Sequence, residues 1–177
     1  LLAAKGVREL VVIAQDTTSY GLDIGGSRSL AGLLEKIAGV EGIEWIRLMY
    51  AFPARFPMDV LEVIADNPKL CKYLDMPVQH VSDPVLKSMR RGISRRAMLD
   101  LIEKIQMRVP GIALRTTLIV GYPGERESDF KDTLEFIKKI RPNMVGFNLF
   151  MPLPGTPTGW RSSMATGRLP MPSLTGA

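Results

Sequence analysis

The sequence predicts an α/β fold in which parallel strands alternate with helices as part of a (β/α) barrel. Five short apolar runs rich in β-branched residues alternate with segments whose apolar residues recur at helical spacing. No two successive runs are joined by a hairpin turn, so every connection has room for a helix. A doubly wound sheet is the alternative, but no G-x-G-x-x-G follows the first run. Polar residues collect after the runs, at the edge where barrel enzymes carry their active sites.

The first half of the chain contains three of the predicted strands. Residues 9–14 and 43–49 are β-branched or apolar runs, and residues 72–76 form the third. Between them, residues 30–37 place leucines and an isoleucine on one helical face, and residues 58–66 form a shorter helix that Asn67-Pro68 stops. The region is therefore expected to consist of successive βα units.

The second half continues the same alternation. A short helix begins at Ser82-Asp83-Pro84, and Ser94 caps a longer one that ends at Pro110-Gly111. The fourth strand is expected at the start of the stretch 114–125, which breaks on glycine and proline. Ser128 is expected to cap a helix whose inward residues are Phe130, Leu134 and Ile137, and residues 144–150 form the fifth strand.

The two ends of the chain differ from this pattern. Residues 1–6 resemble the end of a helix already under way, with Gly6 at its C-cap, which suggests a fragment. Residues 152–177 are rich in Ser, Gly, Pro and Met without period, so a poorly ordered tail is expected. The predicted domains are residues 1–151, the barrel core, and residues 152–177, the irregular tail.

Composition limits the classes of function. The formal charge of +5 and the pI near 9.5 fit a ribosome, RNA or other acidic partner, although many proteins without such a partner are equally basic. No signal peptide, long apolar run or lipidation motif is present, so a soluble cytoplasmic protein without membrane contact is expected. Cys71 is the single cysteine, which excludes an internal disulfide and a multi-cysteine metal site within these residues.

Loop residues after the strands are the candidates for chemistry. Gln15 and Asp16 follow the first strand, and Asp75 with Gln79 and His80 follows the third. His80 is the only histidine and could act as a general base, or it could satisfy backbone groups in a turn. Both aspartates could bind a ligand amine or ribose, or they could cap loops. The residues leave these alternatives open.

The fourth strand and its loop add further candidates. Arg115 lies inside an apolar strand, where a charge needs either an ion pair or a polar barrel interior. Gly121 and Gly124 allow close backbone approach to a ligand such as a phosphate, or they make a turn. No P-loop signature follows them. The clusters Arg90-Arg91 and Arg95-Arg96 are interpreted as a solvated face, with nucleic-acid contact as the minority interpretation.

Several motifs together resemble the radical S-adenosylmethionine methylthiotransferases. These motifs are Tyr73-Leu-Asp-Met-Pro-Val-Gln-His80 with Leu86 and Met89-Arg-Arg-Gly92, Arg115-Thr-Thr-Leu-Ile-Val-Gly-Tyr-Pro-Gly-Glu125 with Asp129-Phe130, Gln15-Asp16 with Tyr20-Gly21, and Trp45-Ile-Arg-Leu-Met-Tyr50 with Pro53. The resemblance extends to about Gly146. Within the family, Asp75-Met-Pro-Val-Gln-His80 resembles the branch that modifies an aspartate of a small-subunit ribosomal protein. The tRNA-modifying branch usually has a serine-glycine-serine run after that glutamine, where this chain has His80-Val81-Ser82. After Gly146 the chain departs from the usual tyrosine-serine segment.

The resemblance implies a partial TIM-like barrel of the radical SAM type that binds S-adenosylmethionine beside a [4Fe-4S] cluster. A ribosomal protein or the ribosome would be the substrate, with an electron donor and possible RNA contact. By strand order, the resemblance assigns cofactor binding to Gln15, Asp16, Asp75, Gln79, His80, Arg115, Thr117 and Gly121. The three cluster cysteines of the family are absent, so they and the first barrel strand are expected upstream of Leu1. The fragment alone is expected to be inactive, and a non-catalytic or phosphate-binding barrel is the alternative from another class.

Overall fold

A computed structural model describes residues 1–23 and 29–152. The predicted tail, residues 152–177, lies almost wholly outside the described residues. Five parallel strands form one sheet in the order β1-β2-β3-β4-β5, and no hairpin joins them. The strands are β1 (Glu9–Val12), β2 (Trp45–Leu48), β3 (Leu70–Asp75), β4 (Ala113–Val120) and β5 (Met144–Leu149). The sequential order confirms a partial barrel, because a doubly wound sheet reverses its strand order.

The helices follow the strands as predicted, with one wrong boundary. They are α1 (Leu30–Ala38), α2 (Asp59–Asp66), α3 (Asp83–Ser88), α4 (Arg95–Arg108) and α5 (Glu127–Ile140), with short 3-10 turns η1 (Ala3–Lys5), η2 (Thr17–Ser19) and η3 (Pro53–Arg55). Ser94 caps α4 as expected, since its hydroxyl accepts the Ala97 N–H at 3.2 Å. The cap predicted at Ser128 is wrong. Arg126 holds that position, because the Asp129 carboxylate accepts the Arg126 N–H and sets the first turn.

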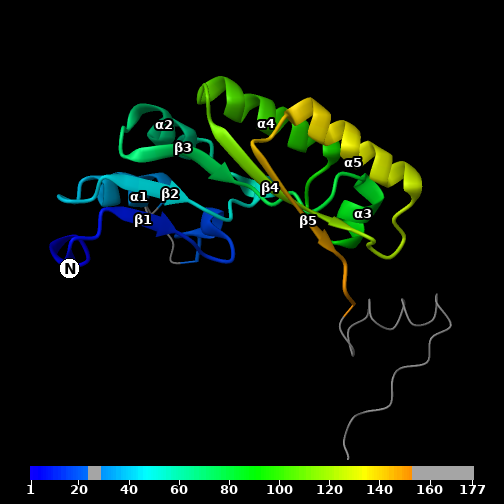
Figure 1. Cartoon of the computed structure of the whole chain (residues 1–177), viewed down its shortest axis with the longest axis horizontal. Helices are drawn as coiled ribbons and strands as arrows, with labels where there is room; N and C mark the ends of the chain where they lie inside the picture. Colours follow the sequence, from blue (N-terminus) through cyan, green and yellow to red (C-terminus); the bar gives the residue numbers. More distant parts are fainter. Residues whose placement is uncertain (24–28, 153–177) are drawn as a thin grey trace, which may run out of the picture.

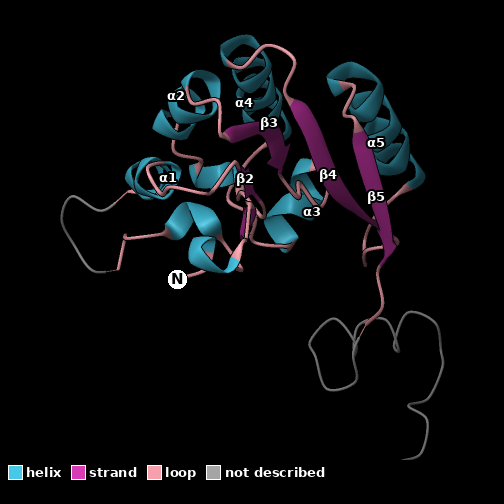
Figure 2. Cartoon of the chain, turned by 60° about the vertical axis from the view of Figure 1, so that its left-hand side comes forward, coloured by secondary structure: helices cyan, strands magenta, loops and turns pink. Residues whose placement is uncertain are grey.

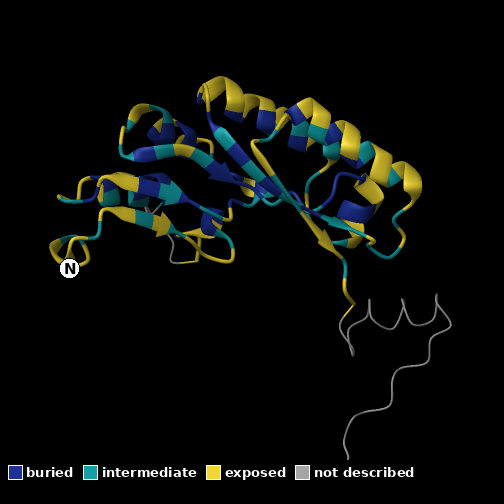
Figure 3. Cartoon of the chain, in the orientation of Figure 1, coloured by how far each residue is buried: buried dark blue, intermediate teal, exposed yellow. Residues whose placement is uncertain are grey.

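The helices lie along one face of the curved sheet (Figures 1 and 2). Every second side chain of the inner strands packs against them, including Ile46, Leu48, Leu74 and Leu114, and these form the core with Met98, Ile102 and Ile105 of α4. Figure 3 shows the buried residues gathered between this helical layer and the sheet. The alternate strand positions point away from the helices, to the concave face.

The inward face of α5 differs from the prediction. Phe136 and Ile140 are buried, together with Thr133, whereas Phe130 and Leu134 are exposed. α5 packs against α4, whereas most side chains of the neighbouring β5 are exposed, and Phe130 and Leu134 are each 39% exposed. Ile137 packs at the margin of the core.

Candidate functional site

The loops after the strands meet in series at one edge of the sheet. Thr17 joins the first two loops, because its N–H and hydroxyl both donate to the Tyr50 carbonyl. The loop after β2 is joined to the end of β3 at Asp75, whose carboxylate accepts the Tyr50 N–H at 3.4 Å and whose carbonyl accepts the Ala51 N–H at 2.9 Å. The loop after β3 is joined to the end of β4, where the Ile119 N–H donates to the Gln79 carbonyl at 2.7 Å. The loops after β1, β2, β3 and β4 therefore form a continuous rim at the carboxyl ends of the strands.

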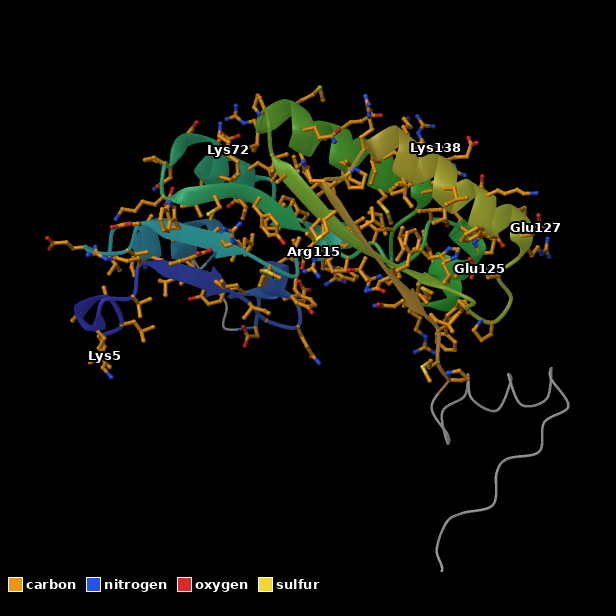
Figure 4. All side chains as sticks on the ribbon, in the orientation of Figure 1. Lys5, Lys72, Arg115, Glu125, Glu127 and Lys138 are labelled. Atoms are coloured by element: carbon orange, nitrogen blue, oxygen red, sulfur yellow. The ribbon has the colours of Figure 1, made fainter. Side chains whose placement is uncertain are left out.

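Asp75 and Arg115 lie side by side on the concave face. They are register partners on β3 and β4, and the Arg115 Nη1 lies 3.6 Å from the Asp75 Oδ1. The Asp75 side chain is 2% exposed, and its Oδ1 has no hydrogen-bond partner among the described residues. Arg115 is about one third exposed, and Figure 4 shows it near the middle of the sheet. A buried carboxylate oxygen without a donor is ready to accept a hydrogen bond from a ligand hydroxyl or amine.

Asp16 caps the turn after β1. Its carboxylate accepts the Thr18 N–H at 2.9 Å and the Ser19 hydroxyl at 2.6 Å. Partial burial raises the pKa of the Asp16 carboxyl, but hydrogen bonds from Ser19 and Thr18 outweigh this effect and leave the pKa below its ordinary value. Asp16 therefore has the loop-capping role, and it also lines a hollow of about 660 Å³ between β1, η2 and α1.

The segment after β3 is tied to β4 by backbone and side-chain bonds. Gln79 N–H donates to the Thr117 carbonyl at 2.9 Å, and Gln79 adopts a left-handed φ of 69°. A non-glycine residue rarely adopts this conformation, and such residues cluster at functional sites. Tyr50, with a φ of 57°, has the same conformation at the end of β2. The rim thus holds two strained residues in fixed positions.

His80 is fully buried rather than exposed at the rim. Its Nδ1 accepts the Ser82 N–H at 3.0 Å, and its Nε2 lies 3.2 Å from the Glu125 Oε1. The side chains of His80 and Glu125 are 0% and 7% exposed. With its Nδ1 hydrogen-bonded and its Nε2 facing a buried carboxylate oxygen, His80 is not accessible as a general base.

Glu125 closes the glycine-containing turn that follows β4. Residues 122–125 form a turn in which Glu125 N–H donates to the Tyr122 carbonyl at 2.9 Å and Gly124 takes a φ of 91°. The Glu125 Oε2 accepts the N–H groups of Gly121 and Tyr122. These two N–H groups are the ones that a phosphate cradle would need. The geometry therefore does not favour the phosphate-binding alternative.

Arg91 departs from the solvated face expected for the basic clusters, whereas Arg90 and Arg96 are exposed as expected. Its guanidinium stacks on the Phe52 ring at 4.3 Å and donates to the Pro77 carbonyl at 2.9 Å. Burial lowers the pKa of the Arg91 guanidinium, and the Asp16 carboxylate opposes this shift. Arg91 thus connects the loop after β2 to the loop after β3. Arg95 is about one third exposed and pairs with Asp132 at 2.8 Å.

The remaining predicted residues fall at the same edge. Thr117 shares the concave face of β4 with Arg115, opposite Gly146 of β5, and Gln15 is exposed beyond β1. Gly121 follows β4 with a φ of 76°. Sequence reasoning missed the roles of Thr17, Arg91 and Glu125. A half-buried arginine has no sequence signal here, but a glutamate four residues after the strand-ending glycine could have suggested a closed turn.

The described residues do not supply a cluster site. Cys71, the single cysteine of the sequence, is partly buried on β3. No group of three His, Cys, Asp or Glu side chains that could hold a metal gathers within residues 1–23 and 29–152. A single thiolate does not fit a [4Fe-4S] cluster, which needs three or four. In the same ranges, no helix is both long enough and apolar enough to cross a membrane.

Comparisons with known proteins agree with this geometry. The RimO ribosomal protein uS12 methylthiotransferase of Flavobacterium johnsoniae is 54% identical over 145 residues, which cover 82% of this chain and 33% of that protein. That of Christiangramia forsetii is 56% identical over 145 residues, covering 82% of this chain and 32% of the relative. The chain spans about a third of the length of the curated relatives it matches.

The fold also matches solved structures. The crystal structure of Streptococcus suis SuiB bound to S-adenosylmethionine aligns with a TM-score of 0.56 at 11% identity, covering 94% of this chain and 38% of that one. The family described as the radical SAM superfamily matches residues 1–137. Sequence and fold agree on the same parallel half-barrel, and the chain belongs to the radical SAM superfamily.

Proposed function

We propose that the chain forms the S-adenosylmethionine-binding part of an enzyme that methylthiolates an aspartate of ribosomal protein uS12. The observation that carries the substrate is the 48–56% identity to relatives with that name over most of this chain. The segment Asp75-Met-Pro-Val-Gln-His80, which begins at the last residue of β3 and resembles the ribosomal-protein branch, supports the same choice. A ribosomal substrate would place the enzyme in the cytoplasm, and the net charge of +5 suits a ribosome or RNA surface.

The residues on the concave face fit S-adenosylmethionine. When bound and reduced by an electron donor, this cofactor supplies the radical chemistry that activates a substrate C–H bond. Asp75 would accept hydrogen bonds from the amine or ribose hydroxyls through its free Oδ1, and Arg115 would face the cofactor carboxylate. Thr117, Gln15 and Gly121 are proposed to line the same site at the strand ends. No residue of this chain is assigned to the cluster.

Asp75→Asn is expected to weaken S-adenosylmethionine binding about tenfold, because it removes the charge that accepts the ligand hydrogen bonds while it keeps the shape. Equilibrium dialysis on the full-length protein, with iron content measured in parallel, checks this result. Glu9→Gln is the matched control, because Glu9 also pairs with an arginine, Arg47 at 3.0 Å, but at the other end of the strands. Equal weakening by both variants would contradict the assignment of Asp75.

The substrate is tested with the reconstituted full-length protein under anaerobic conditions. Mass spectrometry of uS12 and of bulk tRNA after incubation with S-adenosylmethionine is expected to show a methylthio group on an aspartate of uS12 and no change in tRNA. Modification of tRNA with unmodified uS12 would instead assign the protein to the tRNA-modifying branch. No modification of either, with a full cluster and bound cofactor, would rule out both.

A further inference from the structure

His80 and Glu125 bring together the loop after β3 and the loop after β4. The last backbone hydrogen bond between these two segments is the one that Ile119 donates to Gln79. His80 belongs to the segment after β3, and Glu125 ends the turn after β4. The His80 Nδ1 accepts an N–H from Ser82, so this nitrogen carries no proton, and in the neutral ring the proton is on Nε2. The His80 Nε2 lies 3.2 Å from the Glu125 Oε1, a close contact that falls short of hydrogen-bond geometry, and neither atom has a hydrogen-bond partner among the described residues.

The second carboxylate oxygen of Glu125 fixes the turn itself. It accepts the backbone N–H groups of Gly121 and Tyr122, the first two residues after β4. One carboxylate therefore connects the backbone at the end of β4 to an imidazole from the neighbouring loop. Figure 4 shows Glu125 beside α3, the helix that begins just after His80.

Burial makes this arrangement sensitive to the loss of either partner. The Glu125 side chain is only 7% exposed, so its charge is stabilised by its donors rather than by water. Without the imidazole, Oε1 keeps no donor within reach, and a buried charge without a donor is costly. The carboxylate would then rotate toward solvent and release the two N–H groups that hold the turn.

Two further side-chain contacts lie at the same junction. The Ser82 hydroxyl donates to the Asp129 carboxylate, and this hydrogen bond is the main cause of the lowered pKa of Asp129. The hydroxyls of Ser88 and Tyr122 lie 3.3 Å apart. The Tyr122 ring packs edge-on against Phe150 at 5.0 Å, which ties the turn to the end of β5. The His80–Glu125 pair is the buried centre of this junction.

We propose that His80 and Glu125 act as a clamp that positions the β4 backbone edge around Gly121 against the cofactor. The inference rests on the proposed function, because it requires S-adenosylmethionine to lie at that edge. In this role His80 is a positioning residue that touches no cofactor atom. The clamp presents the strand end in one fixed conformation, so binding does not have to order the turn.

The test compares two substitutions of His80 in the full-length protein. His80→Asn keeps an acceptor for the Ser82 N–H but is too short to reach Glu125, whereas His80→Gln is long enough to donate to it. Amide hydrogen exchange is expected to rise at Gly121 and Tyr122 in H80N, with protection partly restored in H80Q. The dissociation constant for S-adenosylmethionine is expected to rise about tenfold in H80N, equivalent to about 1.4 kcal/mol, and less in H80Q.

Controls separate the clamp from general stability and from the proposed function. Ile64→Val, a small core change in α2, is expected to leave exchange at Gly121 and Tyr122 unchanged. Unchanged exchange in H80N, or equal loss of protection in β2, would overturn the clamp. Failure of the wild-type protein to bind S-adenosylmethionine would overturn the proposed function, while the exchange data would still report on the clamp.

If H80N does not fold, Glu125→Gln gives a second route. Its amide oxygen still accepts the N–H groups of Gly121 and Tyr122, but its NH₂ group faces the His80 Nε2–H, donor against donor. Faster exchange in the segment around His80, with the turn at Gly121 less affected, is the expected result. Identical exchange in E125Q and wild type would refute the His80 contact.

Discussion

At the scale of single residues, the rim depends on buried polar groups that each satisfy two backbone positions. Thr116 is an example. It lies on the helix-facing side of β4, is 1% exposed, and its hydroxyl donates to the Met76 carbonyl at 2.8 Å while it accepts the Val78 N–H at 3.4 Å. β3 has ended at Asp75, so this hydroxyl takes over the pairing that the strand no longer provides.

Thr116→Val is expected to lower the free energy of unfolding by about 1–3 kcal/mol, because the nearly isosteric change leaves a buried carbonyl and a buried N–H without a partner. Urea denaturation of the two proteins measures the difference. Thr133→Val is the matched control. Thr133 is equally buried, but its hydroxyl donates to Asp129 O within α5, a carbonyl that the helix already satisfies. A loss as large for T133V as for T116V would contradict this explanation.

At the scale of elements, the start of α5 shows how a loop and a helix share one carboxylate. Asp129 accepts the Arg126 N–H at 2.9 Å, and the Ser82 hydroxyl reaches it from the loop after β3. The Ser82 hydrogen bond is the largest cause that holds the pKa of Asp129 below its ordinary value of 3.8, and the Arg126 N–H adds to it. The carboxylate form thus stabilises both the helix N-terminus and the loop junction.

The sign of this shift predicts a pH dependence. A carboxyl whose pKa is lower in the folded state stabilises the protein above its unfolded pKa, and this stabilisation is lost as the pH falls through the folded value. Asp129→Asn is expected to cost about 0.5 kcal/mol at neutral pH. The difference from wild type should shrink as the pH falls below 3.8. Thermal unfolding across that range measures it.

Asp100→Asn controls for the loss of an exposed charge. Asp100 lies within α4, is exposed, and makes no hydrogen bond or ion pair with the described residues. Its effect on stability should stay small at every pH. A D129N difference that remained constant down to full protonation would show that the charge of Asp129 has no role in holding the junction.

The sequence predicted elements better than contacts, for physical reasons. The strands could be predicted because short runs rich in apolar and β-branched residues, such as residues 114–120, favour buried strands. The parallel arrangement followed because each connection is long enough to contain a helix. The N-cap of α5 could not be predicted, because Arg126 is not a typical cap residue and the carboxylate that sets the first turn lies three residues later. His80 could be noticed as the only histidine, but its burial depends on Glu125 from another loop.

At the scale of the whole molecule, the chain forms a half-barrel with one covered and one open face. β1 and β5 are the two edges of the sheet among the described residues, and β5 has mostly exposed side chains. The open concave face carries Arg47, Tyr73, Asp75 and Arg115, with Arg47 stacked over the Tyr73 ring at 5.0 Å. The scaffold thus offers a polar wall for a cofactor, but it contains one thiol only.

The 177-residue chain is therefore expected to hold no stoichiometric [4Fe-4S] cluster after anaerobic reconstitution, because a cluster needs several thiolates and Cys71 is alone. Iron and sulfide analysis after desalting measures the outcome. Cys71→Ser is the control for adventitious iron, and it should give the same low content as wild type. About four irons per chain, lost in the serine variant, would refute the expectation.

The sequential strand order has a consequence for how this protein is made. Glu9 pairs with Trp45 and Arg115 pairs with Met144, so each strand closes onto the strand that immediately precedes it in the chain. Contacts that span only one βα unit carry a modest loop-closure cost. During synthesis, each unit can dock onto the preceding one soon after it leaves the ribosome, and the half-barrel can grow from its N-terminal end without waiting for its last strand.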